Sequence, residues 1–392
     1  MDLEAFEWLL TDEGQALLTR ATKLTATGGA SLAVQTALRR TAAPAYVAAA
    51  LTQVELRDKG RAKLGDDAAR MYFTPDGLEQ ATRRAVAEHR AARLAAFGAA
   101  SVIDLGCGIG GDLVATARTG ITAAGVDLDP VRVAVARANL AALDLPGAVQ
   151  VADATEVDHS PFAVAFADPA RRGARGRLFD AEGWTPSWSF VETLLRRDSC
   201  VKVAPGIPHE LVPAGVEAEW VSDHGDVKEA ALWSGMLATT DRRATVIGEG
   251  GLATLTSEDD PGAAVQPLGA FLYEPDGAVI RAGLVTAVAA GVQGGLLDEH
   301  IAYVTSDAAY TTPFAKGYRV IEELPYREKQ LRAALRERRV GRLTIKKRGV
   351  AITPETLRRR LGLQGPEEAT IVLTRVAGEG TCLRVEPLTA AS

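Results

Sequence analysis

Glycine occupies alternate positions in the segment VIDLGCGIGGD, where Gly106, Gly108 and Gly110 form the pattern G-x-G-x-G. The apolar run before these glycines is typical of a buried strand, and the residues that follow, GDLVATARTG, have the pattern of a helix. A glycine turn at such a junction lets a ligand approach the backbone and presents amide donors at the start of a helix. Glycine turns after strands are common, so this pattern alone predicts only a candidate nucleotide-binding loop.

Three aspartates end the apolar runs that follow the glycine loop. Asp127 ends TAAGVD, where a carboxylate can accept hydrogen bonds from both hydroxyls of a ribose. Asp153 lies in VADAT, where it could accept a hydrogen bond from an adenine amino group, and Asp168 ends AVAFAD. Doubly wound sheets bind ligands at the carboxyl ends of their parallel strands, so we expect these three side chains at one edge of the sheet.

The glycines do not distinguish a dinucleotide from S-adenosyl-L-methionine, because Gly111 also completes the dinucleotide pattern G-x-G-x-x-G. The nearby acids do distinguish them. Asp104 and Asp112 would place negative charge against a pyrophosphate, whereas a cationic sulfonium tolerates carboxylates. This electrostatic argument favours S-adenosyl-L-methionine as the cofactor.

Strands and helices alternate around these residues, which predicts βαβ units and a parallel sheet with helices on both faces. We expect this domain over residues 98–240, with EAEWVSD and EAALWSG as an antiparallel pair at the edge of its sheet. Residues 1–97 have the periodicity of helices and form a predicted N-terminal helical domain, including one long helix from about Leu78. Residues 241–392 combine short strands with two helix patterns, which indicates a C-terminal α+β region.

The bulk composition fits a water-soluble globular protein: 392 residues, 47% hydrophobic and 24% charged. No apolar run approaches the length of about 18 residues that a membrane span requires, so we expect no membrane association. The three cysteines lack CxxC spacing and the five histidines lack ligand spacing, which favours a reducing, cytoplasmic compartment and no metal site. Nothing in the sequence indicates an oligomeric state.

VIDLGCGIGGD, GVDLDP, ADAT and FADPAR, in this order, resemble the motifs of class I S-adenosylmethionine-dependent methyltransferases. The whole chain also resembles a bacterial group of these proteins that combines MYFTPDGLEQAT, a DPAR motif and a C-terminal THUMP-like domain. The resemblance implies an α/β, Rossmann-like methyltransferase domain between a helical N-terminal domain and an α+β, THUMP-like or ferredoxin-like region. It also implies that Asp104 and the loop Gly106–Gly110 surround the methionine portion, with Asp127 at the ribose and Asp153 at the adenine.

The motif DPAR starts like the (Asp/Asn)-Pro-Pro-aromatic corner of methyltransferases that act on exocyclic amines. In those enzymes the acid or amide orients the amine toward the methyl group, and positioning supplies most of the catalysis. Asp168 and Pro169 keep this start and are the predicted catalytic residues, whereas Ala170 and Arg171 replace the second proline and the stacking ring. An arginine plane, or Trp184 or Trp188, could supply the missing stack, although both tryptophans also suit packing.

Basic residues occur at two places that suit a polyanionic partner. Arg171, Arg172 and Arg175 follow the DPAR corner as predicted substrate-binding residues, and pairing with nearby acids is their alternative role. The segment 316–360 has fifteen Lys and Arg against five Glu, and within it Lys346, Lys347 and Arg348 are predicted phosphate contacts. These features favour RNA as the partner, and a solvated helical face is the alternative.

The sequence therefore predicts an S-adenosylmethionine-dependent methyltransferase that modifies a base nitrogen in RNA. A second hypothesis is methylation of a protein or a small anionic metabolite, with the arginines binding a carboxylate or phosphate. A third is an RNA-binding protein that keeps the cofactor fold without catalysis.

Overall fold

The computed structural model describes residues 2–28, 31–171, 184–376 and 378–388. Contacts divide the chain into two compact units. The first consists of Met1–Val216 and Ala231–Thr239, and the second of Glu217–Ala230 and Thr240–Ser392. The predicted helical and methyltransferase domains thus share most of one unit, and the three-domain division at 97/98 and 240/241 stays a prediction.

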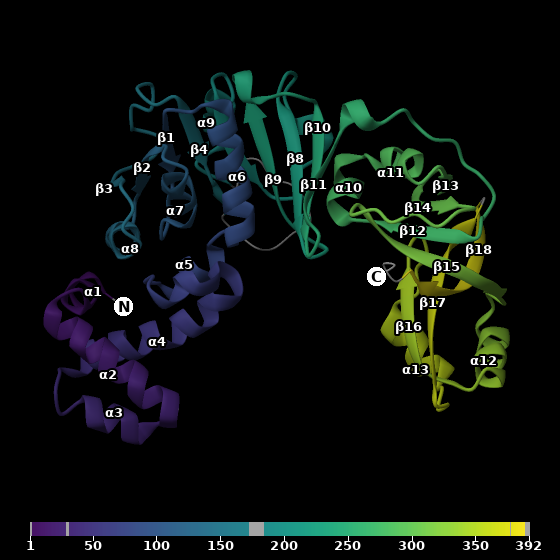
Figure 1. The fold of residues 1–392 in the computed structure, drawn as a ribbon, viewed down its shortest axis with the longest axis horizontal. Coiled ribbons are helices and arrows are strands. Elements are labelled where there is room, and N and C mark those ends of the chain that lie inside the picture. The colour runs from purple at the N-terminus through teal and green to yellow at the C-terminus, as the bar shows by residue number, and fades with distance from the viewer. Residues whose placement is uncertain (1, 29–30, 172–183, 377, 389–392) are drawn as a thin grey trace. The chain divides into compact units, whose positions relative to one another are not determined.

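The first unit begins with helices (Figure 1): α1 (Leu3–Leu9), α2 (Asp12–Gly28), α3 (Leu32–Leu38), α4 (Pro44–Leu64), α5 (Pro75–Gln80) and α6 (Arg84–Phe97). Side-chain caps start several of them, because Asp2, Ser31 and Thr74 each accept a hydrogen bond from a backbone amide in the first turn. Apolar residues of this part of the chain, such as Phe6 in α1 and Phe73 just before α5, share one buried core with Ile109 and Leu113 of the next part. The helices therefore pack directly onto the region of the glycine loop.

The predicted long helix from Leu78 is interrupted. Helix α5 ends at Gln80, Ala81 has extended backbone (φ −55°, ψ 140°), and α6 starts at Arg84. The Lys63 ammonium donates to the carbonyls of Leu78 (2.9 Å) and Glu79 (2.6 Å), which satisfies acceptors that helix continuation would otherwise satisfy. The sequence prediction of one helix was wrong here, and the break sends Thr82 toward the sheet.

A parallel sheet follows in the order β7-β4-β1-β2-β3. Its elements are β1 (Ser101–Leu105), α7 (Gly111–Arg118), β2 (Thr122–Asp127), α8 (Pro130–Ala142), β3 (Ala148–Val151), β4 (Val164–Ala167), α9 (Trp188–Leu194) and β7 (Ser199–Val203). Strands β1 and β4 are buried almost throughout, because helices cover both faces. The short strands β5 (Ala170–Arg171) and β6 (Trp184–Thr185) pair antiparallel after the end of β4.

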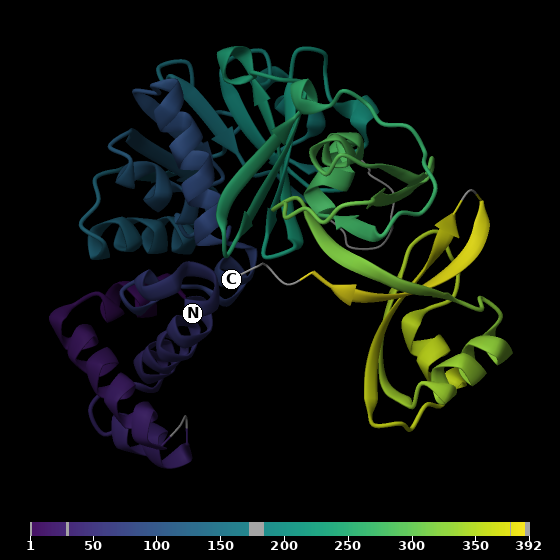
Figure 2. The ribbon, with the colours of Figure 1, turned by 45° about the vertical axis from the view of Figure 1, so that its right-hand side comes forward.

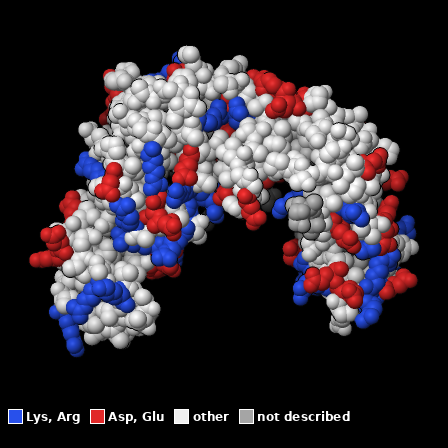
Figure 3. All heavy atoms as spheres, in the orientation of Figure 1, with Lys and Arg blue, Asp and Glu red and all other residues white. Residues whose placement is uncertain are grey.

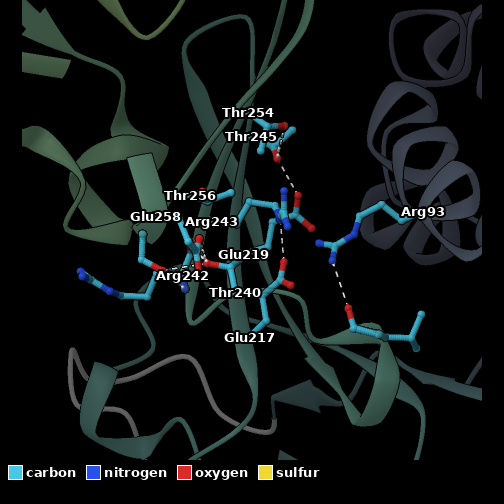
Figure 4. A network of polar contacts seen from close by, with 12 residues as sticks. Arg93, Glu217, Glu219, Thr240, Arg242, Arg243, Thr245, Thr254, Thr256 and Glu258 are labelled. Atoms are coloured by element: carbon cyan, nitrogen blue, oxygen red, sulfur yellow. Dashed lines mark hydrogen bonds and ion pairs between the residues drawn. The ribbon is translucent and has the colours of Figure 1, made fainter. Parts of the chain in front are cut away.

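The second unit begins with four strands, of which β9 continues into the first unit: β8 (Glu217–Asp223), β9 (Asp226–Ser234), β10 (Arg242–Gly248) and β11 (Gly251–Thr256). Strand β8 pairs in parallel with β10, which pairs antiparallel with β11, so β8 is not the edge strand that the sequence suggested. The buried carboxylates of β8 are compensated within this unit (Figure 4). Glu217 accepts a hydrogen bond from Arg243 (2.6 Å), and Glu219 accepts one from Thr245 (2.6 Å).

The rest of this unit is a seven-stranded sheet in the order β13-β14-β12-β15-β18-β17-β16. Its elements are β12 (Phe271–Pro275), α10 (Gly277–Ala282), α11 (Val285–Gly291), β13 (Gly295–Asp298), β14 (Ile301–Ser306), β15 (Ala315–Leu324), α12 (Glu328–Glu337), β16 (Val340–Lys347), α13 (Pro354–Leu361), β17 (Glu367–Val376) and β18 (Glu379–Pro387). Figure 2 shows α12 and α13 together on one side of β16–β18, where Leu331 and Leu357 enter a common core. This is the expected α+β arrangement, except that β16 and β17 are parallel.

Candidate functional site

The glycine loop between β1 and α7 has a backbone that only glycine adopts readily. Gly106, Gly108 and Gly110 have φ angles of 106°, 53° and 83°. A Cβ atom on Gly106 or Gly108 would meet nothing within 4 Å, whereas one on Gly110 would lie 3.1 Å from the Cβ of Ala136. The first two glycines therefore leave space over the backbone for a ligand, and the third allows α8 to pack closely.

Asp127 lies at the end of β2 and is tied to this loop. Its Oδ2 accepts a hydrogen bond from the Gly108 amide (3.0 Å), and its Oδ1 accepts one from the Asp129 amide (2.9 Å). Each carboxylate oxygen can accept a second hydrogen bond, so two vicinal hydroxyls could bind the same group. The carboxylate is thus fixed by two backbone amides and keeps acceptor capacity for a vicinal diol such as that of a ribose.

Asp104 is the least compensated carboxyl group of the site. It is 3% exposed, and its Oδ1 has no hydrogen-bond partner among the residues that the structure describes. Burial raises the pKa of Asp104 well above its usual range, and the negative charges of Asp112 and Asp168 raise it further. A buried carboxyl group in this state fits a ligand that brings positive charge, as the ammonium and sulfonium of S-adenosylmethionine would.

Asp112 does not face the ligand as the sequence argument assumed. Its Oδ1 pairs with Arg90, and its Oδ2 accepts a hydrogen bond from Thr82 (2.9 Å). The Arg90 guanidinium also lies 4.6 Å from the ring centre of Phe166. Because Arg90 neutralises Asp112, this carboxylate gives no argument against a pyrophosphate, and that part of the prediction was wrong.

Asp153 follows β3 at the same edge of the sheet as Asp127. Its Oδ1 accepts hydrogen bonds from the amide (2.8 Å) and the hydroxyl (2.7 Å) of Thr155, which hold the pKa of Asp153 below its usual value. Leu128 and Val151 are 60% and 53% exposed, and Val151 pairs in register with Asp127. These apolar side chains suit the face of an adenine. The sequence analysis missed Leu128, although an apolar residue directly after a strand-ending acid is a readable signal.

Asp168 and Pro169 follow β4 beside the glycine loop. Strand register pairs Ala167 with Leu105 on one side and with Val201 on the other, so Asp168 lies next to both Gly106 and Lys202. The Lys202 ammonium donates to Asp168 Oδ2 at 2.6 Å. Sequence analysis missed Lys202, and its signal is a lysine inside the apolar strand CVKVAP.

Two further residues from the N-terminal part of the chain reach this corner. Lys202 also donates to the Thr82 hydroxyl (3.3 Å), which itself donates to Asp112, so the break between α5 and α6 connects Asp168 and Lys202 to the pair formed by Asp112 and Arg90. Burial, together with the positive charge of Lys202, lowers the pKa of Lys63 to about 8. The corner therefore contains two neighbouring lysines in addition to Asp168.

The predicted arginine contacts after this corner are only partly described. Arg171 lies in β5, and Arg172 and Arg175 are outside the described residues. Trp184 is buried and packs edge-to-face against Trp188 at 5.4 Å between ring centres. Trp184 therefore acts as a packing residue rather than as a platform for a base.

The predicted phosphate contacts of the second unit make intramolecular contacts. Lys346 pairs with Glu274 at 2.5 Å, the Arg348 guanidinium lies 5.5 Å from the ring centre of Tyr303, and exposed Lys347 donates to the Val350 carbonyl (3.2 Å). Basic and acidic side chains also intermix over the C-terminal domain on the face shown in Figure 3. Within the described part of the chain, Lys347 is the member of this trio with the weakest internal contact.

The described residues offer neither a membrane span nor a metal site. No helix in the described ranges has the length and apolar character to cross a membrane. Among the same residues, no group of three or more His, Cys, Asp or Glu side chains could hold a metal ion.

Family models match three segments of the chain. Residues 102–169 match a methyltransferase domain, residues 315–387 match a THUMP domain-like family, and residues 2–60 match a domain of unknown function (DUF8688). The methyltransferase match covers the glycine loop, Asp127, Asp153 and Asp168, and the THUMP-like match covers β15 to β18. Both resemblances seen in the sequence are confirmed.

Whole-chain comparisons agree with these segments. The chain is 39% identical over 343 residues to a protein of Mycobacterium tuberculosis (strain CDC 1551 / Oshkosh) named an uncharacterized S-adenosylmethionine-dependent methyltransferase. The match covers 84% of this chain and 93% of the relative, and the protein of strain H37Rv matches equally. The crystal structure of a candidate methyltransferase from Porphyromonas gingivalis W83 has the same fold, with a TM-score of 0.72 at 22% identity over 88% of this chain and 91% of that chain.

The Rossmann-like fold, the THUMP-like region and the cofactor assignment of the sequence analysis are thereby confirmed, and the hypothesis of a non-catalytic protein is set aside. S-adenosylmethionine supplies an electrophilic methyl group when bound, and Asp104, the glycine loop and Asp127 fit its ammonium, backbone contacts and ribose. The chain belongs to the S-adenosylmethionine-dependent methyltransferases.

Proposed function

We propose that this methyltransferase modifies a base nitrogen in RNA, with Asp168 orienting the acceptor. The observation that carries the acceptor site is the position of Asp168. Strand register places it directly beside Gly106, and its charge raises the pKa of Asp104. A carboxylate so close to the cofactor loop can hold an N–H group near the methyl group to be transferred, and such positioning is the main requirement of a displacement at carbon.

The cofactor side of the proposal assigns one task to each group. The Asp104 carboxylate would compensate the ammonium of the methionine portion, the amides of the loop would line its backbone side, and Asp127 would accept from the ribose hydroxyls. Asp153 and Leu128 would border the adenine. These groups bind and orient, so we expect their loss to weaken cofactor affinity.

RNA as the acceptor is supported by the THUMP domain-like match over residues 315–387 and by the excess of ten positive charges over residues 316–360. Lys347, Arg359 and Arg336 are exposed members of this segment and can contact phosphates. Lys346 and Arg348 are engaged with Glu274 and Tyr303, so we assign them a supporting role. Methylation of a protein or a small anion remains the second hypothesis, because the arginines after DPAR would suit either.

The test uses the purified full-length protein with methyl-labelled S-adenosylmethionine. Total RNA from a strain lacking the gene should accept label, whereas RNA from the parent strain should accept little because its sites are already methylated. Asp168→Ala should lower incorporation by about 100-fold, because it removes the group that positions the acceptor. Asp158→Ala, which replaces a matched exposed aspartate, should have no effect. Label confined to protein or small molecules would overturn the proposal.

A further inference from the structure

The ion pair between Lys202 and Asp168 is the feature of the acceptor corner that the proposed function does not explain. The two residues follow paired positions of neighbouring parallel strands, and their charged atoms lie 2.6 Å apart. The Asp168 side chain is 35% exposed and the Lys202 side chain 17% exposed. An acceptor that reaches Asp168 therefore meets a carboxylate with an ammonium directly beside it.

The position of this ammonium is fixed by a directed chain of hydrogen bonds. Lys202 donates to Thr82, Thr82 donates to Asp112, and Asp112 is neutralised by Arg90. The Thr82 hydroxyl uses its hydrogen on Asp112, so its oxygen is left to accept from Lys202. Three side chains, Thr82, Asp112 and Arg90, thus hold the Lys202 ammonium beside the carboxylate of Asp168.

A cation at this point has opposite effects on two kinds of acceptor. An exocyclic amine gains positive charge as its lone pair attacks the methyl carbon, so a neighbouring ammonium opposes the reaction. A ring N–H beside a carbonyl reacts by losing its proton, and negative charge spreads onto the carbonyl oxygen. A preorganised ammonium stabilises that developing charge.

We propose that Asp168 and Lys202 together bind the cyclic amide edge of a base, so that the acceptor is a ring nitrogen next to a carbonyl. N1 of guanine and N3 of uracil have this chemistry, whereas the amino groups of adenine and cytosine do not. This inference rests on the proposed function and narrows its acceptor. It also accounts for Ala170 and Arg171, which stand where the amine methyltransferases have a second proline and an aromatic residue.

The transfer balances without any other reactant. Asp168 accepts the proton of the ring N–H, and the nitrogen electron pair forms a bond to the methyl carbon. The bond from that carbon to the sulfonium sulfur breaks, and sulfur keeps the electron pair as a neutral thioether. Lys202 donates a hydrogen bond to the carbonyl oxygen throughout, and Asp168 later releases its proton to water.

The deciding experiment methylates RNA from the gene-deletion strain with labelled cofactor, digests it to nucleosides and identifies the labelled nucleoside by mass spectrometry. We expect label in a ring-nitrogen product such as 1-methylguanosine or 3-methyluridine. Label in an exocyclic product, such as N6-methyladenosine or N4-methylcytidine, would overturn this inference and leave the proposed function intact. RNA that accepts no label would overturn the proposed function and this inference together.

Variants at position 202 test the charge itself. Lys202→Met and Lys202→Gln should each lower kcat/KM by about 100-fold, the size expected for one charge-stabilising donor, while Lys202→Arg retains most activity. The affinity for S-adenosylhomocysteine should change less than about two-fold in all three, which separates this role from a structural one. Lys59→Met, in an exposed pair with Glu55, is the control. Full activity in Lys202→Gln would overturn the inference, because glutamine keeps a donor but not the charge.

Discussion

The sheet edge that carries the glycine loop in the first unit (the glycine-loop edge) and the basic segment 316–360 in the second unit differ in the partners of their polar groups. Asp104 is buried with Oδ1 lacking a hydrogen-bond partner among the described residues, and the space over Gly108 is open. Lys346 is paired with Glu274, and Arg348 lies over Tyr303. The first region thus leaves one buried carboxylate oxygen and the space over its glycines open, whereas these two basic side chains of the second region contact groups of their own unit.

The number of charges in a segment is therefore a weaker guide to binding than the partners those charges have. The basic segment looked as informative as the glycine loop in the sequence. In the structure, the loop combines glycines at positive φ, open space over Gly106 and Gly108, and the buried carboxyl group of Asp104, whose Oδ1 has no hydrogen-bond partner among the described residues. Variants in both regions test this contrast, and those in the loop should have the larger effects.

Gly108→Ala should have the largest effect on the cofactor. The new Cβ would enter the open space over the loop, so we expect S-adenosylhomocysteine affinity to fall by at least about 100-fold, or roughly 3 kcal/mol. Gly98 provides a matched control, because it too has positive φ (82°) and nothing within 4 Å of an added Cβ, but it ends α6. Both variants should lose about 1 kcal/mol of unfolding free energy from backbone strain. If calorimetry gave the same S-adenosylhomocysteine affinity for the variants at Gly108 and Gly98, the glycine loop would have no special role in cofactor binding.

Asp104→Asn should weaken the cofactor by about 10- to 100-fold, as expected for loss of a buried charge-assisted contact. The raised pKa of Asp104 also predicts proton release, because a bound ammonium favours the ionised carboxylate and lowers that pKa. Binding enthalpy should therefore depend on the ionisation enthalpy of the buffer in the unsubstituted protein and much less in the variant. Proton uptake on binding would contradict the assigned role.

Lys346→Ala and Lys347→Ala should affect different properties of the basic segment: the first should lower the stability of the protein, and the second should weaken RNA binding. Removing Lys346 leaves Glu274, whose side chain is 21% exposed, without its ion-pair partner and with the hydroxyl of Tyr318 as a hydrogen-bond donor, so we expect a loss of about 1 kcal/mol in urea unfolding. Removing Lys347 should leave stability unchanged and reduce the salt dependence of RNA binding by about one unit of slope. A loss of stability in Lys347→Ala together with a reduced salt dependence of RNA binding in Lys346→Ala would show that the ion pair with Glu274 is not the main role of Lys346.

The smallest effect is expected at Lys63. Its pKa of about 8 predicts a titration near that pH, observable by NMR after reductive 13C-methylation of the lysines. Because folding lowers this pKa, the folded state releases its proton first, and the contribution of Lys63 to stability should rise as pH increases above about 8. Lys202→Met should shift the midpoint upward by removing a nearby positive charge. An unchanged midpoint would show that the two ammonium groups are not close.

The sequence was most informative where a residue type is required by local backbone or by strand position. Gly106 and Gly108 need positive φ, and Asp127 ends β2 while Asp168 directly follows β4, two strands that lie on either side of β1, so their convergence could be predicted. The partners of these residues could not. Lys202 lies 34 residues from Asp168 in the sequence and is brought beside it by the pairing of two strands. Thr82 is brought to this site by the break between α5 and α6, which local helix propensity does not predict.

The partners of charged side chains were the second feature that could not be predicted from the sequence. Asp112 looked like a bare carboxylate in the loop, but Arg90 from α6 neutralises it. Lys346 and Glu274 are 72 residues apart in the sequence, and the residue pattern around neither of them predicts that they pair. Such long-range pairs decide whether a charged group serves a ligand or the fold.

Asp127 offers the clearest test of whether the glycine-loop edge binds the cofactor, by calorimetric titration of S-adenosylhomocysteine into the unsubstituted protein and Asp127→Ala. The carboxylate of Asp127 ties β2 to the Gly108 amide and faces the ribose position in our assignment. We predict saturable one-site binding in the unsubstituted protein and, in the variant, a loss of at least about 100-fold, near 3 kcal/mol. Asp158→Ala, an aspartate that similarly accepts from a backbone amide two residues on, should bind normally. Equal affinity in all three proteins would contradict the assignment of this edge to the cofactor.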